Sequence, residues 1–326
     1  ENKKSTAKEY LSIAPKVAAK FSAYLPIGNG CDNFCAYCVV PYARGREQYR
    51  APHEIIAEAK KFIAQGYEEI FLIAQNVNSY KFAATRADLS SFSGKKIGEL
   101  INFPELLQAV NDLTGDFWIR FATSHPKDMS DELIKVIARG KKITPYVHLP
   151  IQAGDDQTLQ AMNRKYTVKH YLSLIAKIRK AIPDAAISTD VIVGFPGETK
   201  KQFNNTVKLM EKVKFDMAYL AQYSPRPGTA AFKLKDNVPA AEKKRREQIL
   251  ADILKKTAWE NNKKFLNKQT LVLLERKNKK GEWIGKNPQY KTVKVGGAAA
   301  KNLAGEFVRV KINEVKDFGL TGRLIK

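Results

Sequence analysis

The residues of this chain that most directly suggest chemistry are its three cysteines, Cys31, Cys35 and Cys38. They are the only cysteines among the 326 residues, and their spacing is C-x3-C-x2-C. Iron–sulfur clusters are usually held by cysteine thiolates. Three thiolates on one loop can therefore ligate three irons of a [4Fe–4S] cluster and leave the fourth iron open to a small molecule.

A structural zinc site is the main alternative for the same residues. Such a site takes four protein ligands, and His53 is the histidine near enough in sequence to be the fourth. A disulfide framework is disfavoured because the cysteine count is odd and very low for this length. With no signal-peptide pattern and no apolar run of about 18 residues, the sequence favours a cytoplasmic protein without a membrane partner.

Composition suggests two domains and a polyanionic partner. The chain is 44% hydrophobic and carries a net charge of +23. Residues 261–326 contain 16 Lys and Arg against 5 Asp and Glu, a net of +11. A small basic terminal module is typical of a nucleic-acid binder, although lysine-rich surfaces can also be simply solvated.

The middle of the chain alternates short β-branched runs with amphipathic stretches, a pattern typical of βα units around a parallel sheet. Six strands are predicted, at 23–27, 69–74, 117–122, 146–149, 186–193 and 217–222. Helices are predicted at 52–64, 104–113, 130–138, 168–181 and 201–213, with a long βα loop at 79–102. A closed eight-unit barrel typically needs about 250 residues, so six units predict an open, partial barrel in an α/β fold.

A helical connector is predicted at 238–266, with Ile249, Ile253, Leu254 and Trp259 available for packing. Five short β segments follow, at 270–274, 283–285, 292–295, 306–312 and 321–325, separated by turns such as Asn278–Gly281 and 296–297. This spacing predicts a small five-stranded barrel of the OB type.

Polar and glycine-rich loops follow successive strands, where βα barrels place their active sites. After the cysteine loop, these loops span residues 120–126, 148–154 and 190–199. Their histidines, His125 and His148, can instead be structural, and Glu198-Thr199 can be a helix start. Arg44 and Arg46 can meet a phosphate or remain a solvated pair.

The motifs in these loops resemble one family. The run from Gly30 and Cys31 to Arg44-Gly45 resembles the radical S-adenosylmethionine (SAM) loop of methylthiotransferases. The chain is similar to the MiaB-type tRNA enzymes in particular, through Gln75-Asn-Val-Asn78, Arg120-Phe-x-Thr-Ser-His-Pro126, His148-Leu-Pro-x-Gln152, Val193-Gly-Phe-Pro-Gly-Glu-Thr199 and Arg226-Pro-Gly-Thr229. The C-terminal segment resembles the RNA-binding TRAM domain of this family.

The resemblance implies a [4Fe–4S] cluster on Cys31, Cys35 and Cys38, with SAM on the fourth iron and a 5′-deoxyadenosyl radical as the reactive species. Five residues are expected to contact SAM, namely Tyr37, Ser124, Gln152, Val193 and Gly194, and no side chain is assigned a direct catalytic role. The implied reaction adds a methylthio group to C2 of N6-isopentenyladenosine beside the tRNA anticodon. The implied partners are the anticodon stem-loop and an electron donor such as flavodoxin, and a monomer is expected.

Two departures from the family pattern affect the expected domains and activity. Ala153 and Asp155 replace residues common after the Leu-Pro-x-Gln motif, which is a minor change. Family members also carry an N-terminal domain with three more cysteines that hold a second [4Fe–4S] cluster. We therefore expect residues 1–20 to be a linker remnant, 21–235 the radical SAM barrel, 236–266 the connector and 267–326 the TRAM domain.

Without the second cluster, this chain is expected to cleave SAM without completing thiolation. Two rival functions remain open from the sequence. One is an RNA-binding protein with a structural zinc site, and the other is a different radical SAM modification of nucleic acid.

Overall fold

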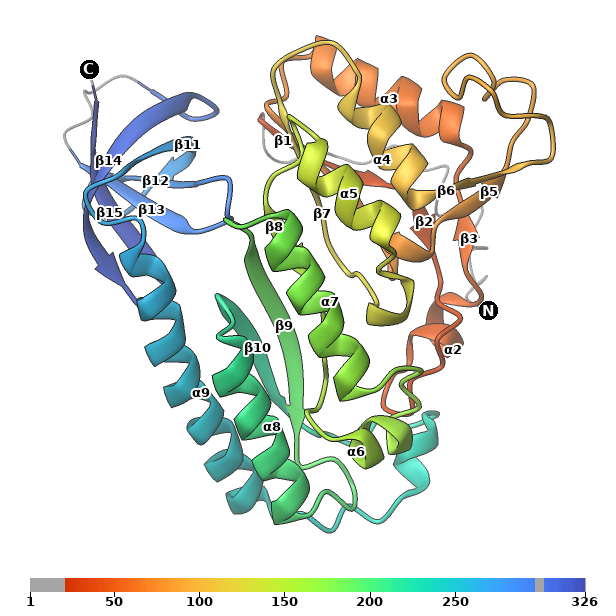
Figure 1. The fold of residues 1–326 in the computed structure, drawn as a ribbon, viewed down its shortest axis with the longest axis vertical. Coiled ribbons are helices and arrows are strands. Elements are labelled where there is room, and N and C mark those ends of the chain that lie inside the picture. Colours follow the sequence, from red (N-terminus) through yellow and green to blue (C-terminus); the bar gives the residue numbers. More distant parts are fainter. Residues whose placement is uncertain (1–20, 297–301, 326) are drawn as a thin grey trace, which may run out of the picture. The chain divides into compact units, whose positions relative to one another are not determined.

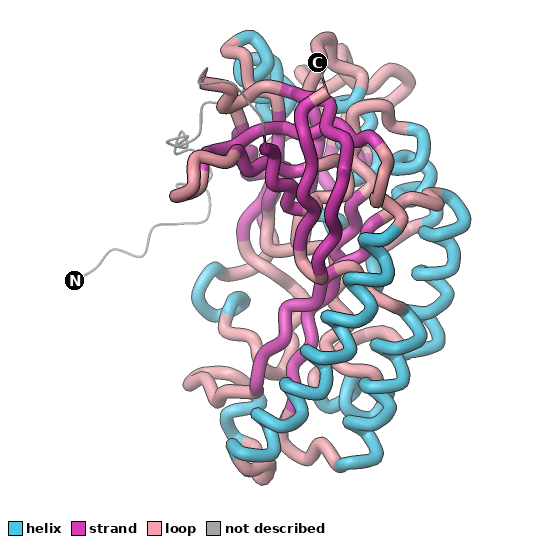
Figure 2. Tube along the Cα trace, turned by 90° about the vertical axis from the view of Figure 1, so that its left-hand side faces the viewer, coloured by secondary structure: helices cyan, strands magenta, loops and turns pink. Residues whose placement is uncertain are grey.

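The computed structural model describes residues 21–296 and 302–325, so the expected linker at 1–20 and Gly297 of one predicted turn lie outside the described residues. Figure 2 shows the helices and strands of the described residues. The chain divides into two compact units. One comprises the residues up to Thr144, Leu159–Ala181 and Ser224–Lys235, and the other Pro145–Thr158, Ile182–Tyr223 and Asp236–Lys326.

The first unit is built on a parallel sheet in the order β1-β4-β7. These strands are β1 (Ser22–Pro26), β4 (Glu69–Ile73) and β7 (Trp118–Phe121), within a residue or two of the predicted ones. Each is paired in register with the next, for example Tyr24 with Phe71. Arg120 of β7 is fully buried and pairs with Glu69 of β4, which compensates for two charges inside the sheet layer.

Four main helices belong to this unit: α3 (Pro52–Ala64), α4 (Phe103–Asn111), α5 (Asp131–Arg139) and α7 (Val168–Ala181). α3, α4 and α5 pack in sequence (Figure 1). Helix α3 begins at Pro52, as predicted, and buries an apolar face that includes Ile55, Ile56 and Phe62. Asn102 and Glu105 form a capping box on α4, a feature worth about 1 kcal/mol.

Short elements that the sequence analysis did not identify shape the loops. Residues 79–102, predicted as an irregular loop, contain a small hairpin of β5 (Lys81–Ala83) and β6 (Leu100–Asn102). The cysteine loop is flanked by β2 (Gly28–Asn29) and β3 (Gln48–Tyr49), which pair antiparallel, and contains α2 (Val40–Arg44). Further short helices are η1 (Val77–Ser79), η2 (Pro126–Asp128), η3 (Ala230–Lys233) and α6 (Asp156–Ala161).

The second unit contains the other three predicted parallel strands, in the order β10-β9-β8. They are β8 (Tyr146–His148), β9 (Ala186–Val193) and β10 (Met217–Gln222), with helices α8 (Lys200–Val213) and α9 (Ala240–Lys263). α8 and α9 lie side by side, and α9 leads into the C-terminal barrel (Figure 1). The six predicted βα strands are therefore all present.

The C-terminal segment forms a closed barrel of five strands in the order β11-β12-β13-β15-β14. The strands are β11 (Gln269–Lys277), β12 (Trp283–Lys286), β13 (Thr292–Gly296), β14 (Phe307–Lys316) and β15 (Gly319–Leu324). Alternate residues fill its core, among them Val272, Trp283, Val310 and Ile312. The strand order 1-2-3-5-4 and the parallel β13–β15 pair are those of an OB-type barrel, as predicted.

Buried polar contacts within the second unit hold the barrel to α9 and to the parallel sheet. Lys291 pairs with Asp216 at 2.7 Å, and both side chains are less than 10% exposed. Asn262 of α9 donates to the carbonyls of Lys316 and Asp317. The packing role predicted for Trp259 is wrong: its side chain is solvent-exposed, and the Lys263 ammonium lies 3.5 Å from its ring centroid. Among the described residues, no helix combines the length and apolarity needed to cross a membrane.

Candidate metal centre and cofactor site

The cysteine loop begins where β1 ends and closes on itself through the β2–β3 pair. The Cys31 amide donates to the carbonyl of Gly45 at 3.2 Å. Gly30 has a φ of +81°, and a Cβ there would lie 2.1 Å from the carbonyl oxygen of Arg46. Only glycine permits both this conformation and this close approach. The glycine before Cys31 therefore sets the shape of the loop.

The centre of the loop is anchored by segments distant in sequence but within the same unit. The Ala36 amide donates to the carbonyl of Met162 at 2.9 Å, and the Ala36 carbonyl accepts from the Ala231 amide at 2.8 Å. The Asn163 side chain donates to the carbonyl of Phe34. These bonds fix the backbone on both sides of Cys35, which is buried, whereas Cys31 and Cys38 are partly exposed.

Polar or cationic groups surround all three sulfurs. Asn33 donates to Cys31 Sγ at 3.4 Å, and Arg164 donates to Cys35 Sγ at 3.3 Å. The Arg226 guanidinium is close enough to favour the Cys38 thiolate electrostatically. Burial nevertheless raises the pKa of both Cys31 and Cys38 above the usual thiol value. Binding to a metal, which takes the thiolate form, would offset this cost.

These thiols fit an iron–sulfur cluster better than a zinc ion. Each thiolate of a [4Fe–4S] cluster binds its own iron, so the sulfurs need not converge on one point. Among the described residues, no three His, Cys, Asp or Glu side chains converge to hold a single metal ion. His53, which the zinc alternative needs as its fourth ligand, instead lies 2.9 Å from Asp88 through Nδ1.

Two expected SAM contacts, Tyr37 and Ser124, lie in the first unit. Burial raises the pKa of Tyr37 well above its usual range, and its hydroxyl is hydrogen-bonded to the Cys35 sulfur. Tyr37 therefore stays neutral. Ser124 follows β7 and is buried, yet within the described part of the chain its hydroxyl has no hydrogen-bond partner. A buried hydroxyl without a partner costs about 1–3 kcal/mol, so a polar ligand there would be favoured. Thr123, just before it, has a φ of +67°.

The other three expected SAM contacts, Gln152, Val193 and Gly194, lie in the second unit. Gln152 is buried with a φ of +72°, a conformation uncommon outside glycine and often found at functional sites. Val193 ends β9 with its side chain fully buried in the core, so only its backbone can face a ligand. The Gly194 amide donates to the Glu198 carboxylate at 2.7 Å.

Helix α9 holds the loop after β9 in this conformation. The Arg246 guanidinium donates to Glu198 Oε2 at 2.7 Å and to the Glu198 carbonyl at 3.0 Å. The stem of Lys243 packs so closely on Gly194 that a Cβ there would lie 2.4 Å from Lys243 Cγ. Thr199, next in the chain, caps α8 with Gln202. The helix start considered for Glu198-Thr199 is therefore present, and Glu198 has a further role as a buried anchor.

The two histidines of the strand-end loops have different surroundings. Burial lowers the pKa of His125 to about 2, aided by the nearby Arg164 charge, so this imidazole is neutral. His125 also contacts the Tyr166 ring edge-on. His148 Nδ1 forms a hydrogen bond with the Ser188 hydroxyl, and His148 Nε2 lies 3.5 Å from the Asp190 carboxylate.

Comparisons with known proteins agree with this fold. Residues 25–210 match the radical SAM superfamily, and residues 263–325 match the TRAM domain. Coproporphyrinogen III oxidase from Escherichia coli, described as a radical SAM enzyme, has a TM-score of 0.52 over 94% of this chain and 70% of its own, at 13% identity. That likeness supports the fold alone. The chain belongs to the radical SAM superfamily, and the predicted α/β fold with a C-terminal TRAM barrel is confirmed.

Sequence relatives define the family more narrowly. A protein from Acetivibrio thermocellus is 43% identical over 98% of this chain, and one from Clostridium botulinum is 42% identical over 100% of it. Both are named tRNA-2-methylthio-N(6)-dimethylallyladenosine synthase. Within the superfamily, the chain therefore belongs to the MiaB-type family. It spans 63% and 69% of the length of these two relatives. The domain boundaries placed at 20/21, 235/236 and 266/267 stay predictions.

Sequence reasoning missed the turn at residues 162–166 between α6 and α7, which brings Asn163 and Arg164 to the cysteine loop. Its residues form no periodic pattern and carry no ligand-type side chain, so no local signal pointed to them. Arg226 was noted only as part of a motif, and its position near Cys38 emerges from the structure.

Proposed function

We propose that Cys31, Cys35 and Cys38 hold a [4Fe–4S] cluster that binds SAM, and that the chain is the radical-generating part of a tRNA methylthiotransferase. The observation that carries this proposal is the anchored cysteine loop with Asn33, Arg164 and Arg226 near its sulfurs. When bound, the cluster supplies the electron that cleaves SAM, a reaction beyond side-chain acid–base chemistry.

The protein's own contribution in this proposal is placement. The Ser124 hydroxyl would hold a polar group of SAM, and Tyr37, Gln152, Val193 and Gly194 stay predicted SAM contacts. The proposed substrate is N6-isopentenyladenosine, the N(6)-dimethylallyladenosine in the names of its relatives, at the position beside the tRNA anticodon that the family resemblance implies. A loop base is already unpaired, so presenting it to the site costs little. The electron would come from a low-potential donor such as flavodoxin. The protein in this proposal is a monomer in the cytoplasm.

We expect this chain to make 5′-deoxyadenosine from SAM but no methylthiolated RNA, because its three cysteines are committed to one cluster and none is left to hold a sulfur-donating cluster. The assay incubates anaerobically reconstituted chain with SAM, a reductant and isopentenylated tRNA. Mass spectrometry then quantifies 5′-deoxyadenosine and digested nucleosides. Multiple turnovers of 2-methylthio product would refute the expectation that sulfur insertion needs a second cluster that this chain cannot hold. Absence of 5′-deoxyadenosine would refute the radical function.

The RNA-binding surface that we assign lies on the TRAM barrel. Arg309 and Lys311 point outward from β14, and Lys311 is directly paired with Arg323 of β15. Like charges opposite each other on a sheet are destabilising. None of the three forms an ion pair with another described residue. A phosphate backbone would neutralise this cluster of three exposed cations.

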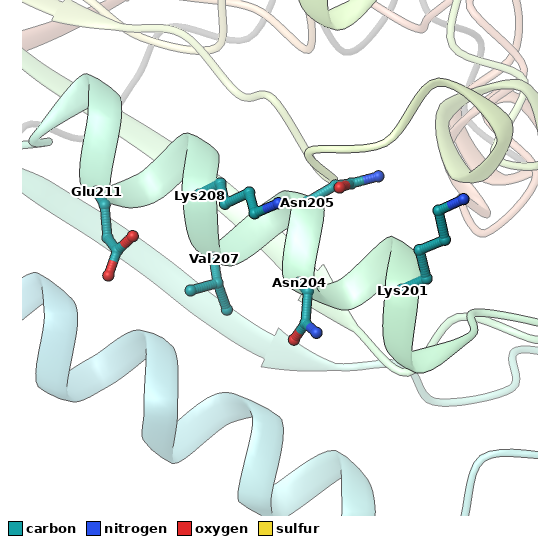
Figure 3. A pocket seen from close by; sticks show the side chains of 6 residues that line it. All are labelled: Lys201, Asn204, Asn205, Val207, Lys208 and Glu211. Atoms are coloured by element: carbon teal, nitrogen blue, oxygen red, sulfur yellow. The ribbon is translucent and has the colours of Figure 1, made fainter.

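Changing Arg309, Lys311 and Arg323 together to Gln should weaken tRNA binding and flatten its salt dependence. Each lost phosphate contact lowers the slope of log K against log salt by about 0.7–0.9. The matched control changes three exposed lysines of α8, Lys201, Lys208 and Lys212, to Gln. The first two line a pocket along that helix (Figure 3). Equal effects of the two triple variants, measured by filter binding at several salt concentrations, would show that only net charge matters.

A further inference from the structure

Arg164 is a buried cation in contact with a proposed cluster ligand, and the proposed function gives it no role beyond lying near that sulfur. Its side chain is buried, and Nη1 donates to Cys35 Sγ at 3.3 Å. Nε donates to the Tyr166 hydroxyl at 2.8 Å, and the guanidinium lies 5.0 Å from the Tyr166 ring centroid. These contacts fix both the position and the orientation of the charge behind Cys35.

Arg164 is charged, whereas its neighbours are neutral. An arginine guanidinium is not deprotonated in proteins, so Arg164 keeps its charge although it is buried. Burial raises the pKa of Tyr166 to about 12, so the phenol stays protonated. His125, which packs on Tyr166, is neutral. The positive charge of Arg164 is thus held against the Cys35 sulfur.

We propose that Arg164 is a positioning residue that tunes the reduction potential of the cluster through the Cys35 sulfur. The proposal rests on the proposed function, because it needs a cluster on Cys35. Reduction adds one electron, taken from an external one-electron reductant, and no bond or proton is exchanged. The extra negative charge is stabilised by a buried cation and by a hydrogen bond to sulfur, two factors that set the potentials of iron–sulfur centres. Arg164 should therefore make the cluster easier to reduce.

The test compares midpoint potentials of reconstituted variants without SAM, by following the EPR signal of the reduced cluster during a redox titration. Arg164→Met should make the reduction equilibrium at least tenfold less favourable, a shift of about 59 mV to more negative potential for one electron. Two milder variants should shift the midpoint potential less, in the same direction. Arg164→Lys keeps the charge, and Tyr166→Phe removes the group that accepts the hydrogen bond from Arg164 Nε.

Arg46→Met is the matched control, because Arg46 belongs to the same loop but its side chain is 71% exposed and pairs with Asp32. Solvent should screen that charge and leave the potential nearly unchanged. A wild-type potential in Arg164→Met with full iron content would overturn the proposal. If Arg164→Met fails to hold a cluster, unchanged potentials in both Arg164→Lys and Tyr166→Phe would overturn it. A wild-type chain without any reducible cluster would instead refute the proposed function itself.

Discussion

Replacing Cys35 with alanine should abolish cluster binding and SAM cleavage while leaving the chain folded. Cys35 is the buried member of the three cysteines, and two remaining thiolates cannot satisfy three irons. The backbone around it stays anchored by the bonds of Ala36 to Met162 and Ala231, which do not involve the sulfur. Loss of one buried sulfur from a loop is a small packing change. We therefore expect near-zero iron with an unchanged circular dichroism spectrum.

The control for this variant is Val39→Ala, a partly buried residue of the same loop that carries no ligand atom. It should retain the iron content and SAM cleavage of the wild type. Iron and acid-labile sulfide are measured after anaerobic reconstitution, alongside 5′-deoxyadenosine production. A Cys35→Ala protein with the wild-type amount of cluster would show that Cys35 is not a ligand.

Arg246→Met should cause a large loss of stability. The Arg246 and Glu198 side chains are 4% and 1% exposed. Breaking a buried ion pair by removing one partner typically costs about 3–5 kcal/mol, because the other charge stays buried. The matched control is Arg245→Met, since Arg245 contacts Glu242 from a side chain that is 53% exposed. Surface pairs of that kind are worth about 0–1 kcal/mol.

The loss of unfolding free energy caused by Arg246→Met should depend on pH in a defined direction. Burial raises the pKa of Glu198 even in the intact chain, against the opposing effects of the Gly194 amide and Arg246. Without Arg246 this pKa rises further. The folded variant then binds a proton more tightly than the unfolded chain, so it loses stability as pH rises from the unfolded pKa of about 4.5 through the folded one. Denaturant unfolding should show that the stability difference between Arg246→Met and the wild type shrinks toward acidic pH. A difference that grows there would contradict the role of Glu198 as the buried charge left unpaired.

Local sequence signals were sufficient for most of the fold. The runs at 69–74 and 186–193 predicted β4 and β9 closely because each is rich in strand-forming residues such as Ile, Val, Phe and Thr. The hairpin within 79–102 escaped prediction because strands of three residues are too short to show alternation. Trp259 was misplaced because aromatic residues on a long helix usually pack inward, whereas this one lies under the Lys263 ammonium on the exposed face.

The site was only partly predictable for a physical reason. The cysteine spacing and the strand-end loops are local patterns, so Cys31, Cys35, Cys38 and Ser124 could be selected from the sequence. Apart from Asn33, the groups near the sulfurs are distant from the cysteines in the sequence. Arg164 lies 129 positions from Cys35, and only the folded chain reveals their contact. Likewise, the partner of Glu198 lies on α9, 48 positions away, although Glu198 itself belonged to a recognised motif.

The metal content of the wild-type chain tests the central claim most directly. Protein purified and reconstituted under strictly anaerobic conditions is analysed for iron, acid-labile sulfide and zinc, with its absorption and EPR spectra recorded before and after reduction. The account predicts about four irons and four sulfides per chain, with the EPR signal of a reduced [4Fe–4S] cluster. Stoichiometric zinc without iron would contradict it and leave a structural zinc site in an RNA-binding protein.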